Sequence, residues 1–162
     1  MDQPDAGGAP VPAADHPLAA ATYVQLTTFR RTGEGVPTPV WFAPSVDDAS
    51  LFAAITVDAT GKTKRLAHTQ RVELRACDVR GRVDAGAPTF VGTARVVRDA
   101  EGVASVRRAV VAKYGLPARF SDLADKVGSR VGVRRAPRAG ILVEVEPRPL
   151  AADGAVAGDQ PA

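Results

Sequence analysis

The chain of 162 residues is 45% hydrophobic, which is enough to build the core of one globular domain and excludes a broadly disordered protein. No apolar run reaches the roughly 20 residues that a membrane-spanning helix needs. The one cysteine, Cys77, excludes an internal disulfide and a multi-cysteine metal site, and two histidines are too few for a histidine-based metal centre. The N-terminus lacks the pattern of a signal peptide, so we expect a cytoplasmic protein.

The net charge of +3 understates how basic the central region is. Residues 20–147 contain 20 basic and 13 acidic residues, a net charge of +7. We expect one domain over residues 19–147, flanked by flexible tails at 1–18 and 148–162 that are rich in Pro, Ala, Gly and Asp. A basic domain favours an anionic partner, which can be a nucleic acid, a membrane surface, or a phosphorylated or carboxylated small molecule.

The first predicted element is a β-hairpin. Residues 23–29 alternate between apolar and polar side chains, and residues 36–42 return as the second arm after a Gly-containing turn. Pro37 and Pro39 lie two residues apart, so their missing N–H groups leave a gap on one edge of that arm. This arm is therefore an edge strand, or its open edge faces a ligand. Trp41, just beyond it, is either a core residue or a ligand contact.

The next predicted strand, 51–57, leads into a basic segment that begins at Gly61. We expect a short helix over residues 62–69 that carries Lys62, Lys64 and Arg65. Backbone N–H groups at a helix start carry partial positive charge, and three cations beside them favour an anion. The alternative interpretation is a solvated basic turn.

The rest of the chain contains five more periodic segments and one arginine-rich stretch. Gly92 is expected to mark a β-bulge or a close approach of another backbone, because a glycine inside a strand commonly marks one of these. Six strands joined by mostly short links predict a small antiparallel barrel, a mainly β fold with a few helices. His16 is expected to be a bystander in the tail, and the arginines of 130–138 are either a solvated loop or a second anion-binding segment. The periodic segments are strands at 71–79, 89–97 and 141–146, a helix capped by Asp99 and ended by Gly115, and a short helix over 121–130.

Several segments, in order and spacing, resemble one known family over residues 20–147. The chain is similar to the actinobacterial deazaflavin-dependent oxidoreductases of group B, within the pyridoxamine 5'-phosphate oxidase-like superfamily. The matching segments are Tyr23–Phe29, Thr38–Phe42, Gly61–Leu66, Arg71–Val72, Cys77–Arg82, Gly92–Arg95 and Lys113–Leu116.

The resemblance implies an FMN-binding-like split β-barrel, and a homodimer with cofactor sites at the subunit interface. It implies coenzyme F-420, an 8-hydroxy-5-deazaflavin with a phosphate and an oligoglutamate tail, as the cofactor for hydride transfer to an unidentified conjugated organic acceptor. By position, the resemblance implies that Lys62 and Lys64 bind the phosphate, with Arg65 adjacent. It implies that the deazaflavin ring lies beside the strand from Thr38 to Trp41. The implied cofactor-binding residues are Lys62, Lys64, Arg65, Gly61, Thr56, Thr38, Val40 and Trp41.

Other interpretations remain open at this point. FMN also presents a phosphate to Lys62 and Lys64, so the same fold can serve as an FMN-binding flavoprotein. A cofactor carrier without turnover has the same sequence features. A small basic barrel can also bind single-stranded nucleic acid, but this needs exposed aromatics beside cations, and Tyr23, Phe29 and Trp41 form no such motif.

Two sequence features bear on the implied site. Asp58 precedes the basic segment, where its charge would repel a phosphate unless its side chain points away. No acid–base residue stands out, and we expect neither Tyr23 nor His68 to donate a proton to the substrate.

Overall fold

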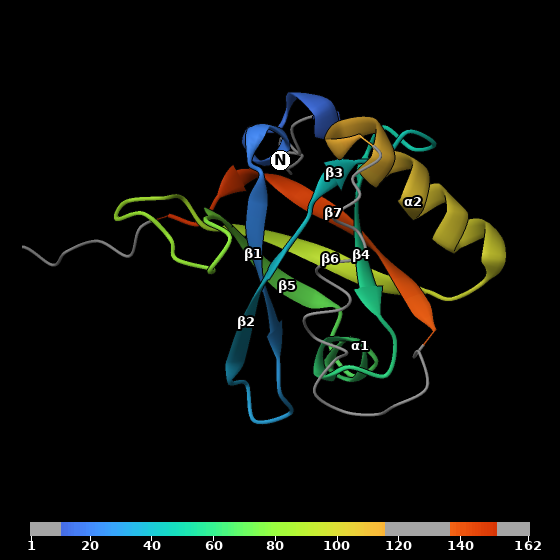
Figure 1. Cartoon of the computed structure of the whole chain (residues 1–162). Helices are drawn as coiled ribbons and strands as arrows, with labels where there is room; N and C mark the ends of the chain where they lie inside the picture. Colours follow the sequence, from blue (N-terminus) through green and yellow to red (C-terminus); the bar gives the residue numbers. More distant parts are fainter. Residues whose placement is uncertain (1–10, 116–136, 152–162) are drawn as a thin grey trace, which may run out of the picture.

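The computed structural model describes residues 11–115 and 137–151, and it folds them into one antiparallel sheet with two helices (Figure 1). The sheet has seven strands in the order β2-β1-β5-β6-β7-β4-β3, which makes a mainly β half-barrel and confirms the predicted fold class. The elements are η1 (Ala13–Asp15), η2 (Pro17–Ala20), β1 (Tyr23–Phe29), β2 (Gly35–Val40), β3 (Ala43–Pro44), β4 (Leu51–Val57), α1 (Gly61–Leu66), β5 (Arg71–Cys77), β6 (Phe90–Val97), α2 (Ala100–Tyr114) and β7 (Arg138–Pro149).

The first hairpin forms as its alternation predicts. β1 buries every second side chain, Val24, Leu26 and Thr28, because a strand directs successive side chains to opposite faces. It pairs with β2 on one side and with β5 on the other. β2, which contains both prolines, is the terminal strand of the sheet, so the prediction of an edge strand is confirmed.

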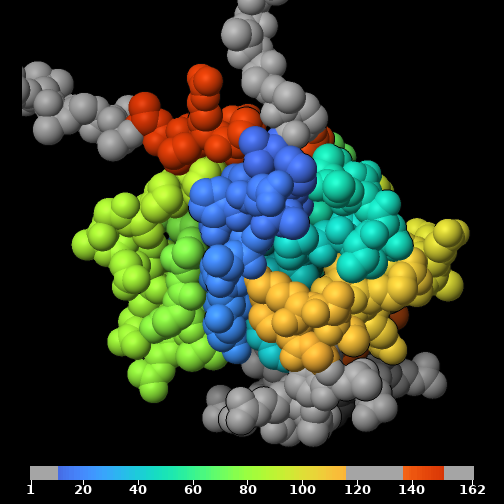
Figure 2. Space-filling view, turned by 90° about the horizontal axis from the view of Figure 1, so that it is seen from above, coloured from blue at the N-terminus to red at the C-terminus, as the bar shows by residue number. Residues whose placement is uncertain are grey.

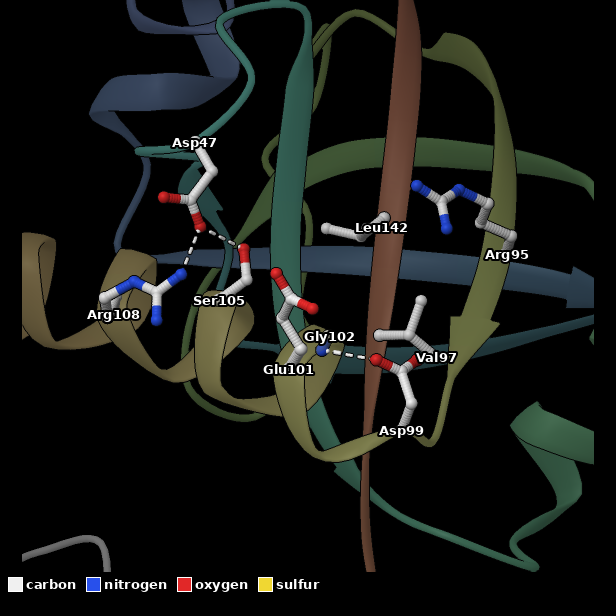
Figure 3. Close-up of a pocket in the computed structure, with 9 residues that line it drawn as sticks. All are labelled: Asp47, Arg95, Val97, Asp99, Glu101, Gly102, Ser105, Arg108 and Leu142. Carbon is white, nitrogen blue, oxygen red and sulfur yellow. Dashed lines mark hydrogen bonds and ion pairs between the residues drawn. The ribbon is translucent and has the colours of Figure 1, made fainter.

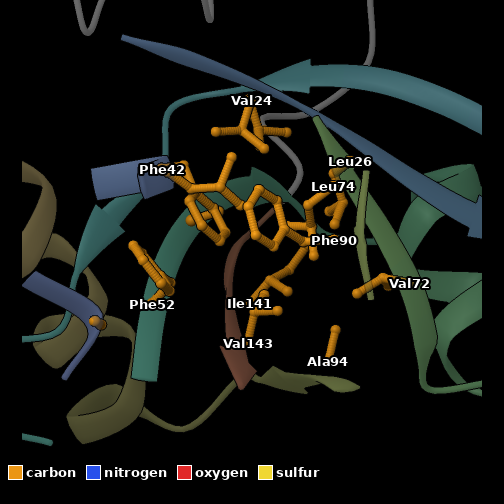
Figure 4. Packing of buried hydrophobic residues seen from close by; sticks show 14 of the residues in the cluster. Val24, Leu26, Phe42, Phe52, Val72, Leu74, Phe90, Ala94, Ile141 and Val143 are labelled. Carbon is orange, nitrogen blue, oxygen red and sulfur yellow. The ribbon is translucent and has the colours of Figure 1, made fainter. Parts of the chain in front are cut away.

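Two apolar clusters lie on opposite faces of the sheet. The inner cluster fills the half-barrel with large side chains such as Phe42, Phe52, Leu74 and Ile141 (Figure 4). The second cluster lies beneath α2, whose Val106, Ala109 and Val110 pack against β4 and β7. Strands β4 and β7 are thus covered on both faces over their central residues. This explains why they read as continuous apolar runs rather than as strict alternation.

Both predicted boundaries of α2 are confirmed. The Asp99 carboxylate accepts a hydrogen bond from the Gly102 N–H at 2.7 Å, as an N-cap should. Gly115 follows the helix with a φ of 78°, a left-handed value that glycine adopts at low cost.

The predicted bulge at Gly92 is also confirmed. The register between β6 and β7 shifts between Phe90 and Gly92. A Cβ at position 92 would stand 2.6 Å from the Glu144 carbonyl oxygen and 3.2 Å from Leu74. Only glycine allows the two backbones to approach this closely.

The expectation of a flexible tail through residue 18 is wrong for residues 13–18. They form turns η1 and η2 against the inner cluster, with Ala13 and Leu18 each 2% exposed. His16 is no bystander: it is buried between Phe52 and Phe90, with ring centroids 5.7 and 4.5 Å away. In the view from above, the blue N-terminal residues lie between the green and the teal segments (Figure 2). Residues 13–18 are thus held against the inner cluster by apolar contacts, which an alternating sequence pattern does not reveal.

Three smaller expectations are corrected. α1 ends at Leu66 rather than at residue 69, and β7 extends to Pro149, into the expected C-terminal tail. The strand predicted over residues 71–79, β5, ends at Cys77. The predicted helix over 121–130 and the arginines before Arg138 lie outside the described residues. Within the described part of the chain, no helix is long and apolar enough to cross a membrane.

Candidate functional site

The basic segment forms α1, at the end of the half-barrel opposite to the N-terminal turns (Figure 1). Thr63 and Leu66, 1% and 4% exposed, anchor the helix, and Leu66 belongs to the inner cluster. The helix packs against β1 and β6. With these two residues turned inward, the three cations of the segment are left on its outer faces.

The helix brings Lys62 and Arg65 together and separates Lys64 from them. Residues three apart share a helix face, whereas residues two apart are about 200° apart around the axis. Lys64 is exposed, and Lys62 is half-buried. Burial lowers the pKa of Lys62, and the nearby Arg65 charge lowers it further. Lys62 therefore lies beside Arg65 rather than beside Lys64, its partner in the pair that the resemblance implies.

Arg65 is tied to the sheet by a hydrogen bond that the sequence did not reveal. Its Nε donates to the Thr28 hydroxyl at 2.7 Å, and Thr28 is fully buried on β1. Burial lowers the pKa of the guanidinium, and the charge of Arg30 adds to this effect, although an arginine stays protonated at any physiological pH. A signal for Thr28 exists in the sequence: it is the one polar residue on the apolar face of its strand.

The charges around this pair favour an anion. Among the described residues, no carboxylate forms an ion pair with Lys62, Lys64 or Arg65. Asp58, which could have repelled an anion, accepts a hydrogen bond from Arg98 Nε at 2.8 Å. That contact is the main reason why the pKa of Asp58 lies below its usual value. The Thr60 hydroxyl, next to the helix, is buried and has no hydrogen-bond partner within the described structure.

The remaining predicted residues lie at the start of α1 and on strands β2 and β4. Thr56 is near the end of β4 opposite Ala139, and Thr38 is on the edge strand β2 opposite Leu26. Gly61 is the exposed first residue of α1. Val40 is 7% exposed and belongs to the inner cluster, so its side chain is a core group.

Trp41 lies apart from the basic pair. Its indole stacks on the Tyr114 ring, with centroids 5.2 Å apart, and it packs against the cluster beneath α2. The register pairs Thr28 with Val36 and Val24 with Val40. The four residue steps from one pair to the other correspond to about 14 Å along the strand. Most of the length of β1 therefore separates Trp41 from the basic pair.

A pocket of about 450 Å³ lies elsewhere, between the first turns of α2 and the outer face of the sheet (Figure 3). It contains none of the predicted cofactor-binding residues. Asp47 accepts hydrogen bonds from Ser105 Oγ and Arg108, at 2.5 and 2.7 Å, and Asp99 caps α2, so most of its charged groups are already satisfied. Its lining is Asp47, Arg95, Val97, Asp99, Glu101, Gly102, Ser105, Arg108 and Leu142.

The described residues contain no group of three or more His, Cys, Asp or Glu side chains that could hold a metal ion. The chemistry of the site is thus that of unpaired cations and hydroxyls at one end of a half-barrel. Such a donor set suits a phosphate or carboxylate ligand.

Comparisons with solved structures support the fold. The conserved hypothetical protein Rv2991 from Mycobacterium tuberculosis is 20% identical, with a TM-score of 0.51 over 77% of this chain and 73% of that one. A candidate 5-nitroimidazole antibiotic resistance protein from Bacteroides thetaiotaomicron is 12% identical, with a TM-score of 0.52 over 80% and 75%. A protein named F420 Reductase is 17% identical, with a TM-score of 0.50 over 79% and 89%.

A comparison with curated protein sequences finds no match. A family model does match: the one described as pyridoxamine 5'-phosphate oxidase covers residues 11–146. That span includes the N-terminal turns, every described helix, and β7 as far as Glu146. The chain therefore belongs to the pyridoxamine 5'-phosphate oxidase family of split β-barrels.

Proposed function

We propose that this protein is an oxidoreductase that binds coenzyme F-420, with its phosphate at Lys62 and Arg65. The observation that carries the proposal is a pair of like charges, half-buried on one helix face, with no carboxylate partner in the described structure. Holding two cations together costs free energy, and a bound dianion would offset that cost. The resemblance in sequence and the F420 Reductase among the structural relatives favour a deazaflavin.

The residues present fit such a group. Lys62 and Arg65 would hold the phosphate, and the unpartnered Thr60 hydroxyl lies beside them. Thr56 and Thr38 lie on strands that run from this end of the sheet, where the rest of the cofactor would extend. When bound, the deazaflavin supplies hydride chemistry, and the protein contributes binding and orientation. Lys64 is assigned a lesser, long-range electrostatic role, and Trp41 is assigned to packing with Tyr114.

The proposal includes a homodimer with cofactor sites at the subunit interface. Among the described strands, the sheet ends at β2 and β3 without closing, and in the proposed dimer the second subunit would enclose the site. A small-molecule acceptor would reach the cofactor from the side that the second subunit completes. Light scattering coupled to size-exclusion chromatography measures the mass directly. A monomer that still binds the cofactor at full affinity would refute this part.

The test of the function has two stages. First, the purified protein is titrated with coenzyme F-420 and, in parallel, with FMN, following ligand absorbance and Trp41 fluorescence. We expect saturable binding of F-420 and weaker binding of FMN, while binding of FMN alone would assign the protein to the flavin-dependent branch. Second, oxidation of reduced F-420 is followed with a panel of quinones and other conjugated acceptors. Tight binding without oxidation of any acceptor would indicate a cofactor carrier.

A further inference from the structure

The Arg65 guanidinium is held on two sides by groups from different elements. On one side, its Nε donates to Thr28 Oγ1 on β1 at 2.7 Å. On the other side, it lies against Gly61, where a Cβ would stand 2.7 Å from Nη1 and 3.4 Å from Cζ. The side chain therefore turns back along its own helix, and the missing side chain at position 61 provides the space that it occupies.

This arrangement decides which donors remain for a ligand. A guanidinium has five N–H donors in one plane, and the Thr28 contact uses the one on Nε. The two terminal nitrogens keep their four N–H groups. Two parallel N–H groups match two oxygens of a phosphoryl group, and a planar fork fixed in advance loses little conformational entropy on binding.

The buried threonine argues for the same conclusion. A hydroxyl on the inner face of β1, beside Val24 and Leu26, is costly to bury unless it is hydrogen-bonded. A valine would fill that space without the cost. A hydroxyl at this position is explained if it serves to hold its hydrogen-bond partner, Arg65, in place.

We infer that Thr28 and Gly61 are positioning residues that hold the Arg65 guanidinium as a fork for a phosphoryl group. Arg65, rather than Lys64, then makes the directional phosphate contact, with Lys62 adding charge on the same face. This inference rests on the proposed function for the identity of the whole ligand, but not for the phosphoryl chemistry.

The test separates the hydroxyl of Thr28 from its shape. Thr28→Val keeps the volume and loses the hydrogen bond, whereas Thr28→Ser keeps the hydroxyl and loses a methyl group. Each variant is titrated by calorimetry with inorganic pyrophosphate, FMN and coenzyme F-420, with Thr27→Val, on the opposite face of β1, as the matched control. We expect Thr28→Val to weaken binding by about two- to tenfold, and Thr28→Ser to bind like the wild type. The reverse order would mean that Thr28 acts by packing, and would overturn the inference.

Gly61→Ala provides a second test that does not depend on a buried position. Residue 61 is exposed and has no left-handed φ, so alanine should preserve the fold and the melting temperature. It should still weaken binding, because its Cβ displaces the guanidinium. Arg65→Lys keeps the charge without the fork and should weaken binding at least as much. Wild-type affinity in both variants would overturn the inference.

The outcomes distinguish this inference from the proposed function. If F-420 binds the wild type, Thr28→Val, Gly61→Ala and Arg65→Lys with the same affinity, the function stands and the inference fails. If neither cofactor binds, but pyrophosphate binds in a manner that depends on Arg65 and Thr28, the inference stands and the function fails. If none of the three ligands binds the wild type, both fail. The Arg65 Nε–H signal in a 15N-correlated NMR spectrum gives a readout without ligand: we expect slow exchange with solvent in the wild type and in Thr28→Ser, and fast exchange in Thr28→Val.

Discussion

The Arg98 guanidinium donates to the Asp58 carboxylate at 2.8 Å, and this contact joins the end of β4 to the end of β6. The contact turns the Asp58 carboxylate, which is the acidic group nearest in sequence before the basic segment, toward Arg98. The sequence alone left the direction of Asp58 open. The electrostatic character of the site thus depends on a residue that is 40 positions away along the chain.

The first prediction concerns this ion pair. Arg98→Ala should weaken binding of F-420 by about two- to fivefold at low ionic strength, because the charge of Asp58 would then act on the phosphate without compensation. The effect should fade in 0.5 M salt, since both side chains border on solvent. Arg108→Ala, which removes the comparable ion pair with Asp47 beside α2, serves as the control and should leave the affinity unchanged. Equal losses in the two variants would contradict this assignment.

A second prediction concerns the hydroxyl of Tyr114. It accepts a hydrogen bond from the Phe42 N–H at 3.0 Å and lies 2.8 Å from the Thr22 carbonyl, so it ties the end of α2 to two loops. Tyr114→Phe should lower the free energy of unfolding by about 1–2 kcal/mol, because it leaves the Phe42 N–H without its partner. Urea denaturation measures this. Trp41 should keep its stacked environment, and an unchanged unfolding midpoint would show that these contacts contribute little.

The third prediction is a pH dependence that arises from His16. The ring accepts from the Leu18 N–H through Nδ1, and its Nε2 lies 3.2 Å from the Glu146 carbonyl oxygen. Burial lowers the pKa of His16 below its usual value, with the Glu146 contact opposing. The folded state therefore favours the neutral ring, whereas the unfolded chain takes up a proton near pH 6.5. The stability that His16 contributes should be complete above that pH and should decline as the pH falls below it.

The comparison of the wild type with His16→Gln isolates this effect, because the two proteins share every carboxylate. The free energy of unfolding of the wild type, minus that of His16→Gln, should fall as the pH is lowered from about 7 to 5. Each unit by which burial lowers the pKa is worth about 1.4 kcal/mol. A difference that stays constant over this range would mean that the histidine titrates alike in the folded and unfolded states.

The fourth prediction concerns the close approach at Gly92. Gly92→Ala should destabilise the protein by about 1–3 kcal/mol, because the added Cβ meets the backbone carbonyl of Glu144, which cannot rotate away. Thermal denaturation followed by circular dichroism measures the loss. Gly61→Ala is the matched comparison, since there the obstructing atom is the end of a flexible side chain. Similar melting temperatures for the two variants would show that the β6–β7 pair can separate at little cost.

Local periodicity was sufficient to predict most of the fold. β1 and β4 have the predicted bounds, because alternation in one case and a bounded apolar run in the other mark a strand clearly. The cap of α2 and the bulge at Gly92 follow from single residues with one strong preference. The N-terminal turns could not be predicted, because Ala13, His16 and Leu18 are buried by tertiary contacts that leave no local pattern.

The sequence could predict which segment forms the candidate site, but not which of its side chains lie together in space. Three cations after a strand indicated an anion-binding region, whereas the choice between Lys64 and Arg65 depends on the helical turn and on Thr28, which is 37 residues earlier. For Trp41, only the tertiary structure shows which residue it packs against. Its place beside a broken strand edge fitted either a core residue or a ligand contact, and the position of Tyr114 on α2 gives it a packing partner.

The dissociation constant of coenzyme F-420, measured for the wild type and for Lys62→Ala/Arg65→Ala, tests the central claim most directly. The account predicts saturable binding to the wild type and a loss of about 100-fold or more in the double variant, as expected when two charge-assisted contacts are removed. The double variant loses the repulsion between two like charges but also leaves the buried Thr28 hydroxyl without its partner, so its unfolding midpoint is measured beside the affinity to show that it is folded. F-420 that binds both proteins with the same affinity would contradict the assignment of the phosphate to this pair.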